Sequence, residues 1–157
     1  YNFARTKNFP SVTLRPTVIY GPGQKTDMFL PSLIQALIDG LRFQMTAGEQ
    51  TRDFIYIDDV VNSVIRSLES NSLRKGQIIN ISSGSPILVK ILTKLVAQLI
   101  GKDSLQLIDF GTLDYRSGEA LEYWALNSRA NELLNWSPCM TLEGGLAKTI
   151  EYFVTPG

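Results

Sequence analysis

The spacing of apolar residues along the chain predicts short strands and longer helices in alternation. Residues 11–19 alternate between apolar and polar positions, are rich in Val, Ile and Thr, and run up to Gly21 and Gly23, which predicts a strand followed by a tight loop. Shorter patterns of the same kind predict strands over 41–45, 53–57, 77–81 and 105–110. Strands that alternate with helices are typical of a layered α/β or α+β domain.

Between these strands, apolar residues recur three and four positions apart, which predicts helices. One helix should begin at Leu30, with Pro31 in its first turn, and should end at Gly40. Another should begin after Asp58 or Asp59, either of which can cap it. The apolar stripe that this second helix is expected to bury consists of Val60, Val61, Val64, Ile65 and Leu68. Further helices are expected over 87–100, capped by Ser85 and Pro86, over 128–134, and from Thr141 onward.

Composition limits the classes of function that the chain can have. Its 157 residues are 44% hydrophobic and 19% charged, which provides enough apolar mass for one globular core. The 15 basic and 15 acidic residues cancel, so nucleic acid is not an expected partner. The absence of histidine excludes histidine metal sites and Ser-His relays, and no metal site is expected.

Cysteine usage and the apolar runs indicate where the protein works. The single cysteine, Cys139, can form no internal disulfide, which favours a reducing, cytoplasmic compartment. The most apolar segment, 87–100, is interrupted by polar residues and is too short to span a bilayer, so no membrane partner is expected. The chain begins at Tyr1 without a signal-peptide pattern, and we expect a fragment boundary there.

Arg52 is the first candidate for a binding residue. It stands between a polar turn and a predicted strand, so its rigid fork of N–H groups is presented at the end of an element, where it suits phosphate oxygens. Its spacing from Asp53, Asp58 and Asp59 leaves an ion pair with one of these carboxylates as the alternative. For Asp58 and Asp59, helix capping is expected rather than acid/base catalysis.

Two motifs, LRPTVIYGPGQ (Leu14 to Gln24) and GEQTRDFIYIDDVV (Gly48 to Val61), stand in a specific order and spacing. They resemble the C-terminal half of the nucleotide-sugar epimerases and dehydratases, the extended branch of the short-chain dehydrogenase/reductase family. The resemblance extends over essentially the whole chain. It implies an α/β fold that is an incomplete Rossmann-type, doubly wound arrangement: C-terminal strands and helices plus the small α/β substrate-binding subdomain, with residues 1–157 as a single fragment.

The resemblance also implies roles for particular residues. Arg52 and Arg116 match the two arginines that bind the diphosphate of the nucleotide sugar, and Glu119 matches an acidic residue near the ribose. Two arginines from distant segments would neutralise a diphosphate without making the whole protein basic. Residues that match positions lining the base or the substrate backbone are Phe29, Phe43 and Met45, although Phe43 and Met45 also fit ordinary core packing.

The loop after the first predicted strand matches the family's Tyr-Gly-Pro loop, which passes close to the nicotinamide and the sugar. The resemblance therefore implies that Tyr20, Gly21 and Pro22 contact the cofactor. Many family members carry a substrate-binding Asn where this chain has Val18. That hydrogen bond is then either absent or supplied by Thr17, which leaves the identity of the sugar open.

Two motifs of the complete family enzymes are missing from these 157 residues. The chain contains neither a glycine-rich dinucleotide fingerprint nor a Tyr-x-x-x-Lys pair, since Tyr1 is followed four positions later by Arg5. The resemblance implies that NAD or NADP binds mainly to a missing N-terminal half, which also supplies the catalytic residues. The chain alone should therefore be inactive, with no catalytic residue of its own and a nucleotide-diphosphate sugar as its partner.

Two other interpretations stay open. A non-catalytic NAD(P)- or ligand-sensing protein would share this architecture, and so would a free-standing structural module. A Tyr-x-x-x-Lys pair upstream of Tyr1 would favour an enzyme over a sensor. The predicted strands 11–19 and 77–81 would expose unpaired edges if they stood alone, so we expect a homo-oligomer or self-association of the fragment.

Overall fold

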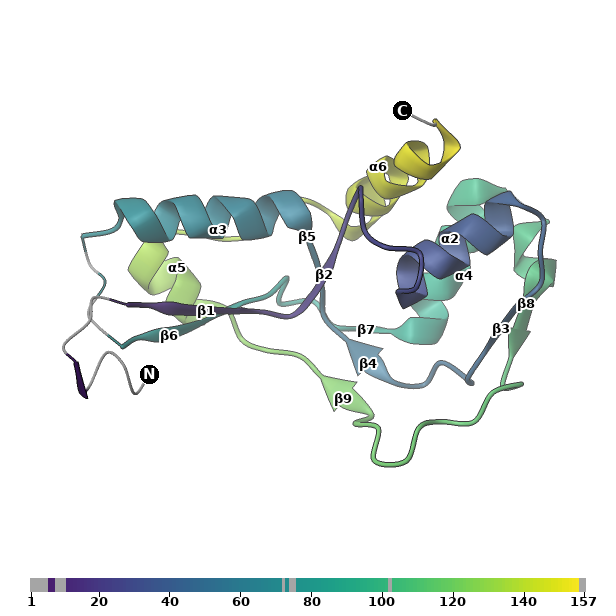
Figure 1. Ribbon diagram of the computed structural model, residues 1–157, viewed down its shortest axis with the longest axis horizontal. Helices are drawn as coiled ribbons and strands as arrows, with labels where there is room; N and C mark the ends of the chain where they lie inside the picture. The colour runs from purple at the N-terminus through teal and green to yellow at the C-terminus, as the bar shows by residue number, and fades with distance from the viewer. Residues whose placement is uncertain (1–5, 8–10, 72, 74–75, 102, 156–157) are drawn as a thin grey trace. The chain divides into compact units, whose positions relative to one another are not determined.

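Figure 1 shows the computed structural model, which describes residues 6–7, 11–71, 73, 76–101 and 103–155. The chain divides into two compact units, each built from three separate stretches. Unit 1 comprises Tyr1–Ile19, Asp53–Pro86 and Trp124–Met140, and unit 2 comprises Tyr20–Arg52, Ile87–Tyr123 and Thr141–Gly157. Tyr1 and Arg5, which the sequence excluded as a catalytic pair, lie outside the described residues.

The strand expected over 11–19 is two strands, because the chain changes its hydrogen-bonding partner at Thr17. Strand β1 (Thr13–Pro16) runs parallel to β6 (Ile78–Ile81), with Thr13 opposite Ile78. Strand β2 (Val18–Tyr20) pairs instead with β5 (Phe54–Tyr56). At the junction, the Thr17 N–H donates to the Ile81 carbonyl and the Val18 N–H donates to the Asp53 carbonyl.

Two helices, α3 (Ile57–Glu69) and α5 (Ser128–Leu134), pack with these strands in unit 1. Figure 1 shows α3 and α5 next to one another beside β1 and β6. The core that they enclose contains Ile55, Ile79, Ile81, Ala130, Leu134 and Trp136, all buried. These residues come from all but the first of the three stretches of unit 1, so the unit depends on contacts between distant parts of the sequence.

The stripe that α3 was expected to bury is largely exposed, so that prediction is wrong. Of its five apolar residues, Val60 packs against the core, and the exposed fractions of the others are 49% for Val61, 44% for Val64, 47% for Ile65 and 82% for Leu68. The buried residues of α3 are Asp59 and Ser63. The helix therefore turns polar side chains toward its own unit and an apolar face away from it.

Asp59 explains why the inward face of α3 is polar. Its carboxylate accepts hydrogen bonds from the backbone N–H groups of Cys139, at 2.9 Å, and Met140, at 3.1 Å. Its backbone carbonyl accepts one from the indole N–H of Trp136, at 3.1 Å. The capping predicted for Asp58 or Asp59 is wrong, because α3 begins after Tyr56 without a side-chain cap and both aspartates lie in its first turn. Asp59 instead holds the chain that follows α5.

Unit 2 has three main helices packed on one another: α2 (Phe29–Ile38), α4 (Val89–Ile100) and α6 (Leu142–Val154). The predicted start and end of α2 are confirmed, and Gly40 closes it in the left-handed conformation, with φ at +67°. The predicted cap of α6 is also confirmed, since the Thr141 hydroxyl accepts from the Gly144 N–H at 3.1 Å. Among the described residues, no helix is long and apolar enough to cross a membrane.

The strands of unit 2 form two small sheets. Strand β3 (Phe43–Met45) runs parallel to β8 (Ile108–Phe110), which follows a short 3-10 helix, η1 (Ser104–Leu107). Strand β4 (Thr51–Arg52) lies between β7 (Ile87–Leu88) and β9 (Glu122–Tyr123). The strands β4, β7 and β9 were not predicted, because two-residue strands leave no period in the sequence.

The cap predicted for α4 at Ser85 and Pro86 is wrong. The helix begins only after Leu88, because the two preceding residues form β7. Its first N–H groups donate hydrogen bonds to backbone carbonyls. The Val89 N–H donates to the Gln50 carbonyl at 2.9 Å, and the Lys90 N–H donates to the Gly48 carbonyl at 2.8 Å. The start of α4 therefore holds the segment that leads into β4.

Candidate functional site

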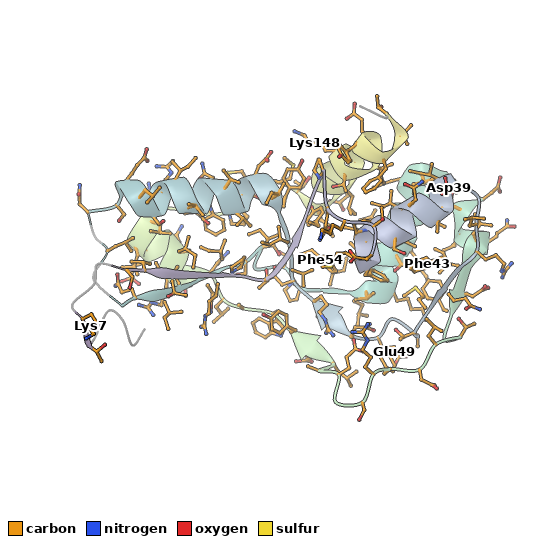
Figure 2. The ribbon with its side chains drawn as sticks, in the orientation of Figure 1. Lys7, Asp39, Phe43, Glu49, Phe54 and Lys148 are labelled. Atoms are coloured by element: carbon orange, nitrogen blue, oxygen red, sulfur yellow. The ribbon has the colours of Figure 1, made fainter. Side chains whose placement is uncertain are left out.

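The segment between β8 and β9 is tied to β3 and to the start of β4 within unit 2. The carbonyl of Met45, the last residue of β3, accepts from the N–H groups of Thr112 and Leu113, at 3.1 and 3.3 Å. The hydroxyl of Tyr115 accepts from the Glu49 N–H at 3.0 Å. These contacts bring the motif around Arg52 and the later Arg-Ser-Gly-Glu element into one region, which contains Glu49 as labelled in Figure 2.

Arg52 is held at the centre of this region by three acceptors. Its Nη1 donates to the Thr51 carbonyl at 2.9 Å and lies 3.5 Å from the Leu121 carbonyl, and its Nη2 donates to Glu119 Oε1 at 3.1 Å. The side chains of Arg52 and Glu119 are only 17% and 23% exposed. The ion pair of Arg52 is therefore with a distant glutamate, and not with one of the neighbouring aspartates that spacing had suggested.

The guanidinium of Arg52 keeps donor capacity after these contacts. An arginine side chain has five N–H donors, and the three contacts use at most three of them. The Nε–H and one Nη2–H have no partner among the described residues. Glu119 likewise keeps its second carboxylate oxygen, Oε2, without a hydrogen bond from those residues. An oriented pair with spare donors and a spare acceptor is suited to a ligand that carries both phosphate oxygens and hydroxyl groups.

Arg116 and Glu119 are the two ends of a single turn. The Glu119 N–H donates to the Arg116 carbonyl at 3.0 Å. Gly118, the third residue of the turn, has φ at +77°, a value that type II turns place at this position and that glycine adopts without strain. The Arg116 side chain is exposed and has no hydrogen bond or ion pair with any described residue. Through Glu119, the structure links Arg52 with the turn that carries Arg116.

The residues predicted to line the base also lie in unit 2. Phe29, at the start of α2, meets Phe43 of β3 edge-to-face, with the ring centroids 6.0 Å apart. Both rings are half-buried, and Met45 is 4% exposed. Successive side chains of a strand point to opposite faces, so Phe43 and Met45 share one face of β3. Figure 2 labels Phe43 among the side chains of this unit.

The predicted cofactor loop begins in the core of unit 2. Tyr20 is 2% exposed, and its hydroxyl donates to the Leu142 carbonyl at the start of α6, at 3.3 Å. Gly21 is buried, whereas Pro22 is exposed. The structure therefore presents Pro22 at the surface and uses Tyr20 to fix the end of β2 to α6.

Thr17, the predicted substitute for the family's asparagine, lies in unit 1 and bonds to Asp53. The Thr17 hydroxyl donates to Asp53 Oδ1 at 3.0 Å, and the same carboxylate accepts from the N–H groups of Ser83 and Gly84, at 2.8 and 3.1 Å. Asp53 is fully buried. It thus joins the β1–β2 junction to the end of β6, a role that the sequence did not predict. The substrate contact assigned to Thr17 stays a prediction.

The described residues contain no group of three acidic or cysteine side chains placed to hold a metal ion. The site combines the guanidinium groups of Arg52 and Arg116 with the Glu119 carboxylate and the rings of Phe29 and Phe43. One contributor, Tyr115, was missed by sequence analysis. No signal in the sequence could have found the bond from Glu49 to Tyr115, because it joins a loop to a loop across a long stretch of chain.

Comparison with known proteins gives a consistent result. The sequence profile of the NAD dependent epimerase/dehydratase family matches residues 1–82. The chain is 30% identical to the UDP-glucuronate 4-epimerase of Thermodesulfobacterium geofontis, over 88% of this chain and 42% of that protein. It is also 30% identical to the human dTDP-D-glucose 4,6-dehydratase, over 92% of this chain and 42% of that protein.

A solved structure shows the same fold. The UDP-glucuronic acid 4-epimerase of Bacillus cereus, in complex with UDP-glucuronic acid and NAD, superimposes with a TM-score of 0.88 at 30% sequence identity. The match covers 97% of this chain and 48% of the Bacillus enzyme. The predicted α/β, incomplete Rossmann-type fold is confirmed. The chain spans about half the length of the proteins it matches.

Proposed function

Because the chain belongs to the NAD-dependent epimerase/dehydratase family, we propose that residues 1–157 supply the nucleotide-sugar-binding part of an NAD(P)-dependent sugar epimerase, dehydratase or reductase. The observation that carries this proposal is the ion pair between Arg52 and Glu119, which links the two arginine motifs in one region of unit 2. The relatives named above act on UDP- and dTDP-sugars, and the Bacillus enzyme holds UDP-glucuronic acid and NAD.

Arg52 and Arg116 would bind the diphosphate. Arg52 is oriented in advance by main-chain carbonyls and by Glu119, so little rotamer entropy would be lost when its spare N–H groups meet phosphate oxygens. Arg116, exposed on the turn beside it, would add a second positive charge. Glu119 would keep Arg52 on one carboxylate oxygen and accept a ribose hydroxyl on the other.

The remaining predicted residues would surround the rest of the ligand. Phe29, Phe43 and Met45 offer the apolar and aromatic surface that a nucleotide base requires. The loop with Tyr20, Gly21 and Pro22 would approach the cofactor and the sugar, and Thr17 would contact the substrate.

The chemistry itself would depend on groups outside these residues. The 157 residues contain no glycine-rich dinucleotide fingerprint and no Tyr-x-x-x-Lys pair. NAD or NADP would therefore be bound mainly by the other half of the family fold, which would also supply the catalytic base, and this chain alone would be inactive. Cys139 is an exposed free thiol, which fits work in the cytoplasm.

Titration calorimetry with the full-length protein tests the proposal. UDP-glucuronic acid and dTDP-glucose are titrated into the wild type and the Arg52→Ala variant. The loss of charge-assisted hydrogen bonds should weaken binding by about 10- to 150-fold. The matched control is Arg42→Ala, because Arg42 is also an ion-paired arginine of unit 2 but bonds to Asp109 outside the site. Equal affinity in the wild type and Arg52→Ala would reject the assignment.

A further inference from the structure

Gln50 is a buried amide that its own unit does not satisfy. It is 9% exposed and immediately precedes β4. Its Nε2 lies 3.4 Å from the Thr46 hydroxyl oxygen, which is longer than a normal hydrogen bond. Its Oε1 is buried and has no hydrogen-bond partner among the described residues. A buried acceptor of this kind lowers the stability of the folded protein unless a ligand or water donates a hydrogen bond to it.

The backbone cannot shift freely to relieve this mismatch. The Gln50 carbonyl accepts the first N–H of α4 at 2.9 Å, and the Thr51 N–H donates to the Leu121 carbonyl at 2.7 Å. The amide is therefore held in place with one polar end unpaired.

The position of Gln50 connects it with the ligand-binding arginine. Gln50 stands two positions before Arg52, directly ahead of β4. The residues on either side of Gln50 and Thr51 both bond to the stretch from Tyr115 to Glu119. Glu49 bonds through its N–H to Tyr115, and Arg52 bonds through its guanidinium to Glu119. The unpaired amide thus belongs to the short segment that carries the proposed ligand-binding arginine.

We propose that Gln50 is a further substrate-binding residue, whose carboxamide accepts a hydrogen bond from a hydroxyl or ring N–H group of the nucleotide sugar held by Arg52. This inference rests on the proposed function and deepens it. The free protein tolerates an unmet acceptor because the ligand supplies the donor, so the residue favours binding at some cost to the stability of the empty protein. Buried polar groups that break the usual rule of satisfaction are expected at functional sites.

The test uses the full-length protein and the substitution Gln50→Met, which keeps the length of the side chain and removes its polar atoms. The free variant should melt at the same temperature as the wild type or higher, because an unsatisfied group has been removed. Its affinity for UDP-glucuronic acid should fall by about 3- to 10-fold. The matched control is Gln44→Met on the exposed position of β3, which should leave the affinity unchanged. If Gln50→Met does not fold, Gln50→Asn retains an amide but withdraws it, and should show the same loss of affinity.

UDP is titrated in parallel to identify the donor. A loss with both UDP and UDP-glucuronic acid places the donor on the nucleotide, and a loss with UDP-glucuronic acid alone places it on the sugar. Unchanged affinity for both ligands in Gln50→Met would overturn the inference, and so would a lower melting temperature of the free variant with unchanged affinity. If Arg52→Ala weakens binding while Gln50→Met does not, this inference alone fails. If Arg52→Ala also binds normally, the proposed function fails with it.

Discussion

Helix α2 in unit 2 and helix α3 in unit 1 have similar spacings of apolar residues but opposite burial. Helix α2 turns its apolar face into its unit and buries Leu30, Pro31, Leu33, Ile34 and Leu37. Helix α3 buries Asp59 and Ser63 and leaves Val61, Val64, Ile65 and Leu68 exposed. Spacing therefore predicts where a helix and its apolar face lie, but not what covers that face.

The difference in burial arises from the segments that pack against each helix in its own unit. Unit 2 covers the apolar face of α2 with α4 and α6, which lie far along the same chain. Unit 1 instead packs α3 through its polar side. There the Asp59 carboxylate accepts hydrogen bonds from the N–H groups of residues 139 and 140, and the Asp59 carbonyl accepts one from the Trp136 indole. An apolar helix face of this kind is typical of surfaces that pack against another protein surface.

The largest contrast should come from removing one apolar side chain from each helix. Ile34 of α2 is fully buried, so Ile34→Ala should lower the free energy of unfolding by about 2–5 kcal/mol, through lost burial and a residual cavity. Ile65 of α3 is half exposed, so Ile65→Ala in the 157-residue chain should cost less than about 1 kcal/mol. Urea unfolding of both variants measures the difference, and equal losses would contradict it.

The same pair of variants sharpens the comparison in the full-length protein. If another surface covers α3 there, Ile65→Ala should cost more in the full-length protein than in the 157-residue chain. Ile34→Ala should cost the same in both, because its surroundings are already complete. An unchanged effect of Ile65→Ala would show that the apolar face of α3 stays open to solvent.

The second prediction concerns the polar side of α3. Asp59→Ala leaves two backbone N–H groups without their carboxylate acceptor, and should destabilise the protein by about 1.5–3 kcal/mol. The matched control is Asp58→Ala in the same first turn, where the side chain is exposed and the cost should be only a few tenths of a kcal/mol. Urea unfolding again measures both, and a greater effect of Asp58→Ala would refute the role given to Asp59.

The exposed apolar face of α3 also predicts that the chain associates with itself. We expect the 157-residue chain to self-associate, and the double substitution Val64→Lys and Leu68→Lys to shift it toward monomer, because charges on the apolar stripe oppose its burial. Sedimentation velocity at several protein concentrations measures the shift. Leu41→Lys is the control, since Leu41 is an exposed leucine of unit 2, and its exposed fraction of 59% lies between those of Val64 and Leu68. A wild-type chain that stays monomeric at every concentration would argue against the prediction.

The sequence predicted those features that depend on local chemistry. Helix α2 ends shortly before Gly40 and helix α6 begins directly after Thr141, because the glycine conformation and the hydroxyl cap need only neighbouring residues. The break at Thr17 and the late start of α4 were missed, because each follows from pairing with a distant segment. Within the site, Arg52 was predicted from its motif, but its bond to Glu119 depends on how the two segments meet in the fold.

The smallest predicted effect compares Asp59, which is buried and bonded to main chain, with Asp109 of unit 2, whose ion pair with Arg42 faces solvent. The hydrogen bonds and charge of Arg42 hold the pKa of Asp109 below its usual value. A carboxylate whose pKa is lower in the folded state contributes stability above its unfolded pKa, about 4, and that contribution is lost as the pH falls through the folded pKa. The difference in unfolding free energy between the wild type and Asp109→Asn should therefore be small at pH 7 and should disappear as the pH falls below about 4. A difference between the wild type and Asp109→Asn that stays the same as the pH falls below about 4 would exclude the effect of Arg42.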